Sequence, residues 1–231
     1  MTDVTIKAGD GGSFYAYVAE PASGSGPGIL VIQEIFGVND QIRRQCDEYA
    51  AQGYFAICPD LFWRQEPGIN LTDQTEAEWQ KAFQLYQGFS EAKGVEDLVA
   101  TLDFLRGYKG VTGKVGSVGY CMGGKLAYLM ATRSDADCNV AYYGVGIEKN
   151  LDEATAIDCP LLMHMGGKDQ FVPPEAQAQI KAALADNRMV TIHSYPDQDH
   201  AFARTNGNHW DPEAARIANE RTAAFFAEHL K

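Results

Sequence analysis

The chain has few basic residues, no long apolar run and no paired cysteine spacing. Its 231 residues contain 19 lysines and arginines against 31 aspartates and glutamates, which leaves a formal net charge of −12 at pH 7. Nucleic acids and anionic membrane surfaces bind through basic patches, so neither is an expected partner. A small anionic substrate stays compatible with this charge, because a few local arginines can override it.

The sequence also shows no segment for export or membrane insertion. Residues 1–5 contain neither a basic nor an apolar region, and the longest apolar run, residues 28–32, is far too short to span a bilayer. The five cysteines are an odd number in scattered positions, which suits a reducing compartment better than a disulfide framework. We therefore expect a cytoplasmic protein. Without CxxC or HExxH patterns, a metal site has little support.

Short apolar segments alternate with segments of helical periodicity along the chain. The expected strands are residues 12–20, 27–33, 54–58, 115–118, 140–143, 161–165 and 190–194. The expected helices are residues 39–52, 75–89, 92–108, 124–132, 174–185 and 212–230. This alternation predicts an α/β fold with a mostly parallel central sheet and helices on both faces. Since the sequence has no internal repeat or linker-like stretch, we expect residues 1–231 to form a single domain.

A predicted strand and a predicted helix flank the segment Gly119-Tyr120-Cys121-Met122-Gly123. Its glycines have the spacing of a nucleophile elbow, in which a strained turn presents the nucleophile above the sheet. A cysteine is more often a small buried apolar residue, and this is our interpretation of the other four, Cys46, Cys58, Cys138 and Cys159. The motif alone supports a catalytic and a structural role for Cys121 about equally.

A cysteine nucleophile needs a base, and the base needs an acid that orients it. Asp169 and His200 each follow a predicted strand, so Cys121, Asp169 and His200 occur in the chain order of α/β-hydrolases and at strand ends. Asp169 has an alternative role as a turn residue, and Asp197 and Asp199 compete with it for the histidine. Three suitable residue types in the right order favour a catalytic triad.

The loop after the strand at 27–33 is expected to face the same turn. The backbone N–H of Met122 and that of Ile35 would together form an oxyanion hole. Glu34, beside them, has two interpretations. It is either a solvated loop acid or cap contact, or a carboxylate that controls the proton of the thiol, because a nearby negative charge disfavours the thiolate whereas His200 favours it.

Several segments between residue 27 and the last helix form a recognisable set. They are Gln33-Glu34-Ile35-Phe36-Gly37, Gly53-Tyr54, Cys58-Pro59-Asp60-Leu61, Gly119-Tyr120-Cys121-Met122-Gly123-Gly124, Tyr142-Tyr143-Gly144-Val145-Gly146, His164-Met165-Gly166-Gly167-Lys168-Asp169 and His200-Ala201-Phe202-Ala203-Arg204. With these segments the chain resembles the dienelactone hydrolase (carboxymethylenebutenolidase) family of α/β-hydrolases. The cysteine elbow and the upstream Gln-Glu-Ile-Phe-Gly together are much more specific than the elbow alone.

The resemblance implies that Cys121 attacks a dienelactone, a cyclic enol ester that carries a carboxylate, and that His200 and Asp169 complete the triad. Glu34 would hold the resting thiol and take its proton when substrate arrives. Hydrolysis of the acyl-enzyme would give maleylacetate in aromatic or chloroaromatic degradation, without a metal or organic cofactor. Arg204 would bind the substrate carboxylate, with a surface arginine as the alternative interpretation. We expect a monomer that acts on a small-molecule lactone or ester.

Two predicted substrate-binding positions depart from the family pattern, while Phe36 matches it. Trp79 occupies the place of a second arginine, and Phe83 that of a tyrosine. A tryptophan cannot pair with a carboxylate, so a larger or less anionic ester or a thioester is an alternative substrate, unless Arg64 compensates. A further alternative is a binding module that keeps the pocket without turnover.

Overall fold

An eight-stranded sheet forms the centre of the protein. The computed structural model describes residues 2–231, and the strand order is β1-β2-β4-β3-β5-β6-β7-β8. The strands are β1 (Thr2–Lys7), β2 (Ser13–Ala19), β3 (Gly26–Ile32), β4 (Phe55–Pro59), β5 (Val111–Tyr120), β6 (Asn139–Tyr142), β7 (Leu161–Gly166) and β8 (Val190–Tyr195). β2 runs antiparallel to β1 and β4, and the other neighbouring pairs are parallel. The predicted mostly parallel sheet is therefore confirmed.

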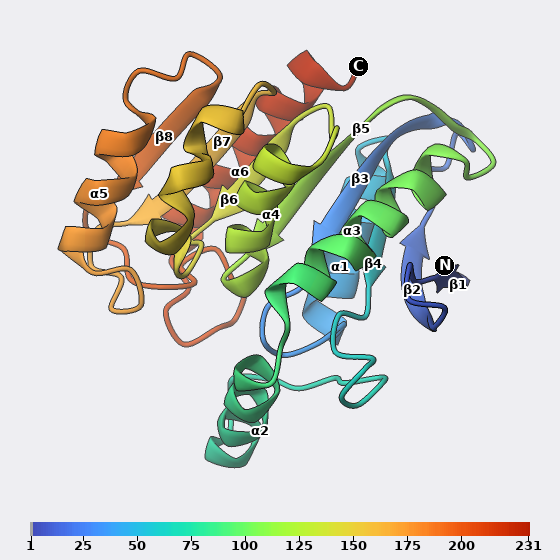
Figure 1. Ribbon diagram of the computed structural model, residues 1–231, viewed down its shortest axis with the longest axis horizontal. Coiled ribbons are helices and arrows are strands. Elements are labelled where there is room, and N and C mark those ends of the chain that lie inside the picture. The colour runs from blue at the N-terminus through green and yellow to red at the C-terminus, as the bar shows by residue number, and fades with distance from the viewer. Residues whose placement is uncertain (1) are drawn as a thin grey trace.

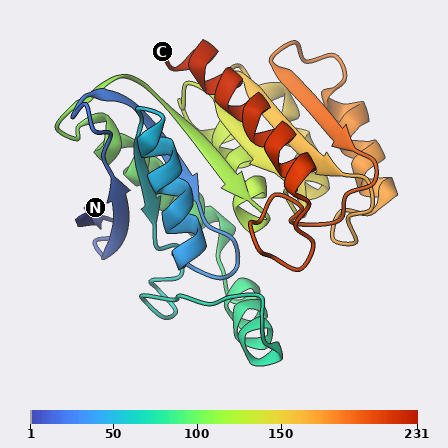
Figure 2. The same ribbon diagram turned by 180° about the vertical axis from the view of Figure 1, so that it is seen from behind.

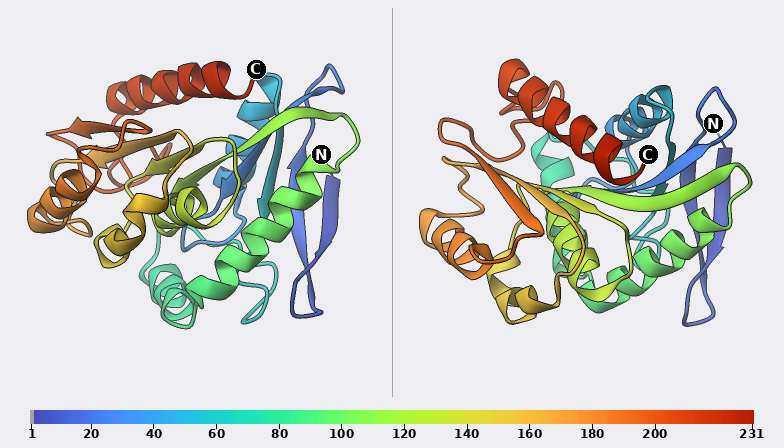
Figure 3. Two further views of the ribbon diagram at one scale, coloured as in Figure 1. Left: turned by 45° about the horizontal axis from the view of Figure 1, so that its top comes forward. Right: turned by 90° about the horizontal axis from the view of Figure 1, so that it is seen from above.

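Helices cover both faces of this sheet, as predicted. The helices of the described chain are α1 (Asp40–Ala51), α2 (Glu76–Gln87), α3 (Glu91–Arg106), α4 (Met122–Arg133), α5 (Pro174–Leu184) and α6 (Pro212–His229), with a 3₁₀ segment, η1, at Ile147–Ala156; all but α2 pack against the sheet (Figure 1). Figure 2 shows α1 and α6 in front of the sheet, and the edge-on view in Figure 3 places α3, α4 and α5 on the opposite face. Within residues 2–231, no helix is both long enough and apolar enough to cross a membrane.

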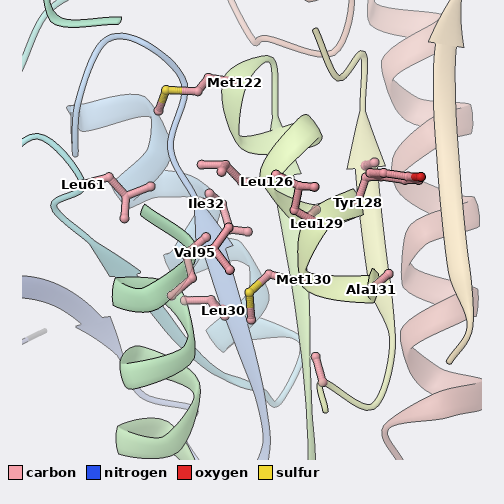
Figure 4. Packing of buried hydrophobic residues seen from close by; sticks show 14 of the residues in the cluster. Leu30, Ile32, Leu61, Val95, Met122, Leu126, Tyr128, Leu129, Met130 and Ala131 are labelled. Atoms are coloured by element: carbon pink, nitrogen blue, oxygen red, sulfur yellow. The ribbon is translucent and has the colours of Figure 1, made fainter. Parts of the chain in front are cut away.

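Alternating side chains of β3 contribute to both layers. Leu30 and Ile32 belong to the apolar cluster under α3 and α4, whereas Ile29 and Val31 belong to the cluster under α1 and α6. Figure 4 shows the first pair facing Val95 of α3 and the side chains of α4. A strand buried on both faces reads as a continuous apolar run, which is why this strand was predictable.

The helix that carries two predicted substrate contacts stands apart from these layers. Figure 1 shows α2 projecting from the rest of the molecule. Its N-cap is Thr75, whose hydroxyl accepts a hydrogen bond from the Glu78 N–H at 3.2 Å. The indole of Trp79 donates to the carbonyl of Asp73 at 3.0 Å, which ties the first turn of α2 to the preceding loop.

Some elements differ from the sequence prediction. β1 and η1 were not expected, β5 begins at Val111 rather than Val115, and α4 begins at Met122 rather than Gly124. β1 is an edge strand in which buried Ile6 lies between exposed neighbours, and the first part of β5 is also mostly exposed. Such strands lack the continuous apolar run by which the other strands were recognised.

The turn between β5 and α4 has little room for side chains. Cys121 adopts φ 55° and ψ −116°, a conformation that a non-glycine residue rarely takes. A Cβ atom on Gly119 would lie 1.9 Å from the Gly123 oxygen, and a Cβ on Gly123 would lie 2.4 Å from the Ile32 oxygen. The two flanking glycines therefore permit the close approach of α4 to β3.

Replacing Gly123 by alanine tests this packing. We expect Gly123→Ala to lower the free energy of unfolding by about 2–4 kcal/mol, because the methyl group would displace the backbone of β3. Gly107→Ala is the matched control, since the nearest atom to its Cβ would be 3.7 Å away. Urea unfolding of both variants measures the difference, and equal stabilities would contradict the proposed contact.

Candidate active site

Cys121, Asp169 and His200 meet at the carboxyl end of the sheet. Cys121 follows β5, Asp169 follows β7, and His200 follows β8. The Cys121 carbonyl accepts the N–H groups of Gly124 and Lys125 at 3.0 and 3.2 Å, which joins the turn to the first turn of α4. The Cys121 side chain lines a pocket together with His200.

Asp169 fixes the orientation of the His200 ring. Its Oδ2 lies 2.8 Å from Nδ1 of His200, and both residues are buried. Its Oδ1 accepts the backbone N–H groups of Phe171 and Val172 at 2.8 and 3.2 Å. Because the carboxylate is held by its own loop, it sets the tautomer of His200 with Nδ1 as donor and leaves Nε2 for the thiol.

The surroundings of His200 favour its protonated form. Burial by itself lowers the pKa of the imidazole, but the charge on Cys121 and the hydrogen bonds with Asp169 and Cys121 outweigh it and raise the pKa to about 10. An imidazolium at this position would stabilise a thiolate on a neighbouring cysteine, which is the arrangement that a cysteine nucleophile with a histidine partner requires.

The competing acids and histidines have other contacts. Asp199 accepts the backbone N–H of His200 at 2.6 Å, so it supports the loop rather than the ring. Asp197 is exposed and pairs with Lys168 at 3.1 Å. His164 is buried in β7, where its ring nitrogens contact the hydroxyls of Tyr195 and Thr222 at 2.9 and 3.0 Å.

Arg204 is a buried arginine held by two carboxylates. Its Nε and Nη2 donate to Oε2 and Oε1 of Glu34 at 2.7 and 3.0 Å, and its Nη1 donates to Oδ2 of Asp73 at 2.9 Å. Burial disfavours the charged guanidinium, but the charge of Glu34 and its hydrogen bond raise the pKa of Arg204 above the ordinary value. Arg204 is 5% exposed, which excludes the interpretation as a surface arginine.

Both carboxylate oxygens of Glu34 thus face the guanidinium rather than the thiol. In residues 2–231 no hydrogen bond joins Glu34 to Cys121. Glu34 is 8% exposed, so it is not a solvated loop acid either. This arrangement differs from the expectation that Glu34 holds the resting thiol. A bidentate pair with arginine is a stronger contact for a carboxylate than a single hydrogen bond from a thiol.

The other predicted residues line the pocket around the thiol. Its lining consists of Ile35, Phe36, Trp79, Phe83, Tyr86, Cys121, Met122, Val145, Phe171, His200 and Arg204. The Trp79 ring packs edge-on against Phe36, with centroids 5.0 Å apart, and stacks on Phe83 at 5.5 Å. One wall of the pocket is therefore aromatic.

Two backbone donors at this pocket are available to a substrate. Within the described chain, the N–H groups of Ile35 and Met122 have no backbone acceptor. Met122 is the first residue of α4, where an N–H has no partner inside the helix. Both donors are therefore candidates for the predicted oxyanion hole.

The other basic side chains considered for substrate binding, Arg64 and Lys81, form ion pairs outside the pocket. Arg64 pairs with Asp10 at 2.9 Å and with buried Asp97 at 2.5 Å, and Lys81 pairs with Glu66. Neither residue lines the pocket, so Arg64 does not compensate for a missing arginine at position 79. Across residues 2–231, His, Cys, Asp and Glu side chains form no group of three that could hold a metal ion.

Five contributors to the site were not predicted: Tyr86 and Val145 line the pocket, and Tyr143, Phe171 and Asp73 contact His200 or Arg204. Tyr143 has φ 38°, and its ring packs on His200 with centroids 5.1 Å apart. Phe171 packs on the same imidazole at 4.8 Å and remains 45% exposed. The sequence signal for Tyr143 was its place after a strand in Tyr142-Tyr143-Gly144. Asp73 gave no signal, because its partner Arg204 is 131 residues away.

The chain is similar to known hydrolases over its whole length. The profile of the "Dienelactone hydrolase family" matches residues 14–230. A "Putative carboxymethylenebutenolidase" of Azospirillum brasilense is 52% identical over 100% of both chains, and a "Carboxymethylenebutenolidase" of Pseudomonas putida is 42% identical over 97% of this chain and 95% of the relative. A "Putative Dienelactone Hydrolase" from Klebsiella pneumoniae superposes with a TM-score of 0.84 at 28% identity, covering 99% of this chain and 100% of that one.

The charge of His200 predicts how the alkylation of Cys121 depends on pH. At pH 6–7 we expect iodoacetamide to alkylate Cys121 at least about tenfold faster in the wild type than in His200→Gln, because the imidazolium stabilises the thiolate. This advantage should be lost as the pH rises through about 10, where the imidazole loses its proton. Peptide mass spectrometry gives the rates, with half-buried Cys159 as the internal control. Equal rates in both proteins at pH 6–7 would contradict the pairing.

Proposed function

The chain belongs to the dienelactone hydrolase family, and on this premise we propose that Cys121 is the nucleophile of a lactone hydrolase that works through an acyl-enzyme. The observation that carries the proposal is the Asp169–His200 contact of 2.8 Å beside the Cys121 thiol. The names of the relatives support a dienelactone, 4-carboxymethylenebut-2-en-4-olide, as the substrate. The proposed role lies in the degradation of aromatic or chloroaromatic compounds.

The first half-reaction opens the ring. The sulfur of Cys121, paired with protonated His200, attacks the lactone carbonyl, and the N–H groups of Ile35 and Met122 stabilise the oxyanion. The bond between the acyl carbon and the ring oxygen then breaks. The proton on Nε2 of His200 passes to the departing enolate oxygen, which leaves a thioester on Cys121 and an enol on the same molecule.

The second half-reaction releases the product. His200, now neutral, takes a proton from a water molecule as that water attacks the thioester carbonyl. The thiolate leaves with the bonding electrons, and the imidazolium again pairs with it. The product is a dicarboxylate whose enol becomes a ketone, which is maleylacetate for the proposed substrate. This chemistry uses only groups of the chain and water.

Glu34 has a conditional place in this cycle. The proposed role, taking the thiol proton when substrate arrives, requires one of its oxygens to leave Arg204 and face Cys121. With both oxygens on the guanidinium, the thiol is paired with His200 and its sulfur is ready to attack. The arrangement with Glu34 on Arg204 therefore corresponds to the activated form in this proposal.

Substitution of the nucleophile tests the covalent route. We expect Cys121→Ala to lower the steady-state rate of dienelactone hydrolysis by about 10³-fold or more, because no thioester can form. Mass spectrometry after rapid mixing should show a transient acyl adduct on Cys121 in the wild type. Cys159→Ala, away from the pocket, should retain activity. Full activity of Cys121→Ala would rule out the proposal.

A less anionic ester is a second candidate substrate. The observation in its favour is the aromatic wall of Phe36, Trp79 and Phe83 in the pocket that Cys121 also lines. An apolar wall stabilises an apolar substituent and offers nothing to a carboxylate.

Kinetics with two substrate types separate these candidates. If a dienelactone is preferred, its kcat/KM should exceed those of simple aryl esters and thioesters by at least about tenfold, a margin of about 1.4 kcal/mol in transition-state stabilisation. The reverse margin would select the second candidate. Tight binding of the dienelactone with neither turnover nor an acyl adduct would indicate a binding module instead.

A further inference from the structure

Asp73 occupies a position that the proposed reaction does not use. It lies in the loop before α2, is 7% exposed, and contacts Arg204 from the side opposite Glu34. Its Oδ2 also accepts the backbone N–H of Asn208 at 3.3 Å, and its Oδ1 accepts the Gln74 amide at 2.5 Å. Its side chain therefore has a partner on each oxygen and a fixed orientation.

Asp73 is ionised at neutral pH. Burial raises the pKa of its carboxyl group, but the hydrogen bond from Gln74 and the charge of Arg204 outweigh burial and hold the pKa below the ordinary value. Arg204 thus carries one positive charge between two carboxylates. The cluster of Glu34, Arg204 and Asp73 has a net charge of −1 when Glu34 is also ionised.

This cluster borders the pocket of the thiol. Arg204 is the single Lys or Arg side chain among the described residues that line it, and all three of its nitrogens already donate to a carboxylate within 3.0 Å. An incoming substrate carboxylate would be the third acid at one guanidinium. Repulsion between like charges is strong where water is excluded, so such a substrate is disfavoured.

We infer that Asp73 is a specificity-determining residue: by occupying Nη1 of Arg204, it makes the pocket select an ester or lactone without a carboxylate over an anionic one. The inference rests on the proposed function, because it concerns the substrate of the same Cys121 site. It favours the second candidate substrate, the less anionic ester, and names Asp73 as the residue that determines the charge preference of the pocket. The wild type would then hydrolyse the dienelactone more slowly than a variant that lacks the Asp73 carboxylate.

The aromatic wall acts in the same direction. Trp79 donates its indole N–H to the carbonyl of Asp73, so one residue anchors both the wall and the guanidinium. The tryptophan ring therefore presents only its apolar surface to the pocket. Asp73 thus links the aromatic wall, through Trp79, to the guanidinium of Arg204, whose charge the two carboxylates already balance.

A matched pair of substrates measures the charge preference directly. The monoester of glutaric acid with 4-nitrophenol carries a carboxylate, and 4-nitrophenyl 5-methylhexanoate has a similar shape without it. In the wild type we expect the neutral ester to have the higher kcat/KM. In Asp73→Asn, which keeps an acceptor for Arg204, we expect the anionic-to-neutral ratio of kcat/KM to rise by about tenfold, mainly through the KM of the anionic ester.

Two further variants make the test specific. Asp40→Asn removes one negative charge from the neighbouring helix start, where the described contacts include no ion pair with Arg204, and should leave the ratio unchanged. Asp73→Ser removes the charge with a smaller side chain and serves if Asp73→Asn does not fold. A purely structural role of Asp73 would lower kcat/KM for both esters alike, so a rise in the anionic-to-neutral ratio separates the two roles.

The outcomes distinguish this inference from the proposed function. If neither ester nor the dienelactone is hydrolysed in a Cys121-dependent way, the proposed function is wrong. If hydrolysis depends on Cys121 but the wild type prefers the anionic ester, or the ratio is the same in the folded Asp73 variants as in wild type, the role of Asp73 is wrong. A raised ratio in the Asp73 variants and not in Asp40→Asn supports it.

Discussion

The backbone of Gly123 passes so close to the end of β3 that a methyl group there would lie 2.4 Å from the Ile32 oxygen. This approach brings the first turn of α4 beside the loop that contains Ile35, so that Ile35 and Met122, from two separate elements, line one pocket. It also leaves Cys121 in a strained conformation with φ 55°. A strained backbone conformation persists only where the surrounding structure holds it in place. Here the apolar clusters on both faces of β3 hold the turn.

The parallel register of the sheet gathers the other groups around that turn. Tyr142 at the end of β6 pairs with His164 of β7, and His164 pairs with His193 of β8, so the loops after these strands begin at the same edge. Each loop is then fixed by its own contacts. Backbone N–H groups hold Asp169, and Asp199 holds the backbone of His200. The geometry of the site therefore follows from strand ends that carry well-anchored loops.

The sequence predicted what depends on local pattern and missed what depends on distant partners. Continuous apolar runs identified β3 and β4, and the glycine spacing identified the turn at Cys121, because close packing leaves its mark within a few residues. β1 escaped notice because an edge strand with one buried face has a weaker pattern. The contact of Asp73 with Arg204 joins residues 131 positions apart, and no local pattern encodes which partner a loop carboxylate finds in the folded chain.

The number of carboxylates around buried Arg204 determines whether its guanidinium is available to bind an anionic substrate. A guanidinium removed from water needs acceptors, and Glu34 alone would satisfy its Nε and Nη2. In that case the pair would be neutral, and Nη1 would remain as a donor toward an incoming acid. Asp73 accepts a hydrogen bond from this nitrogen and adds a negative charge, so the same arginine becomes a structural link between the loop before α2 and the loop after His200. Anion binding and anchoring thus compete for one side chain, and the second carboxylate decides between them.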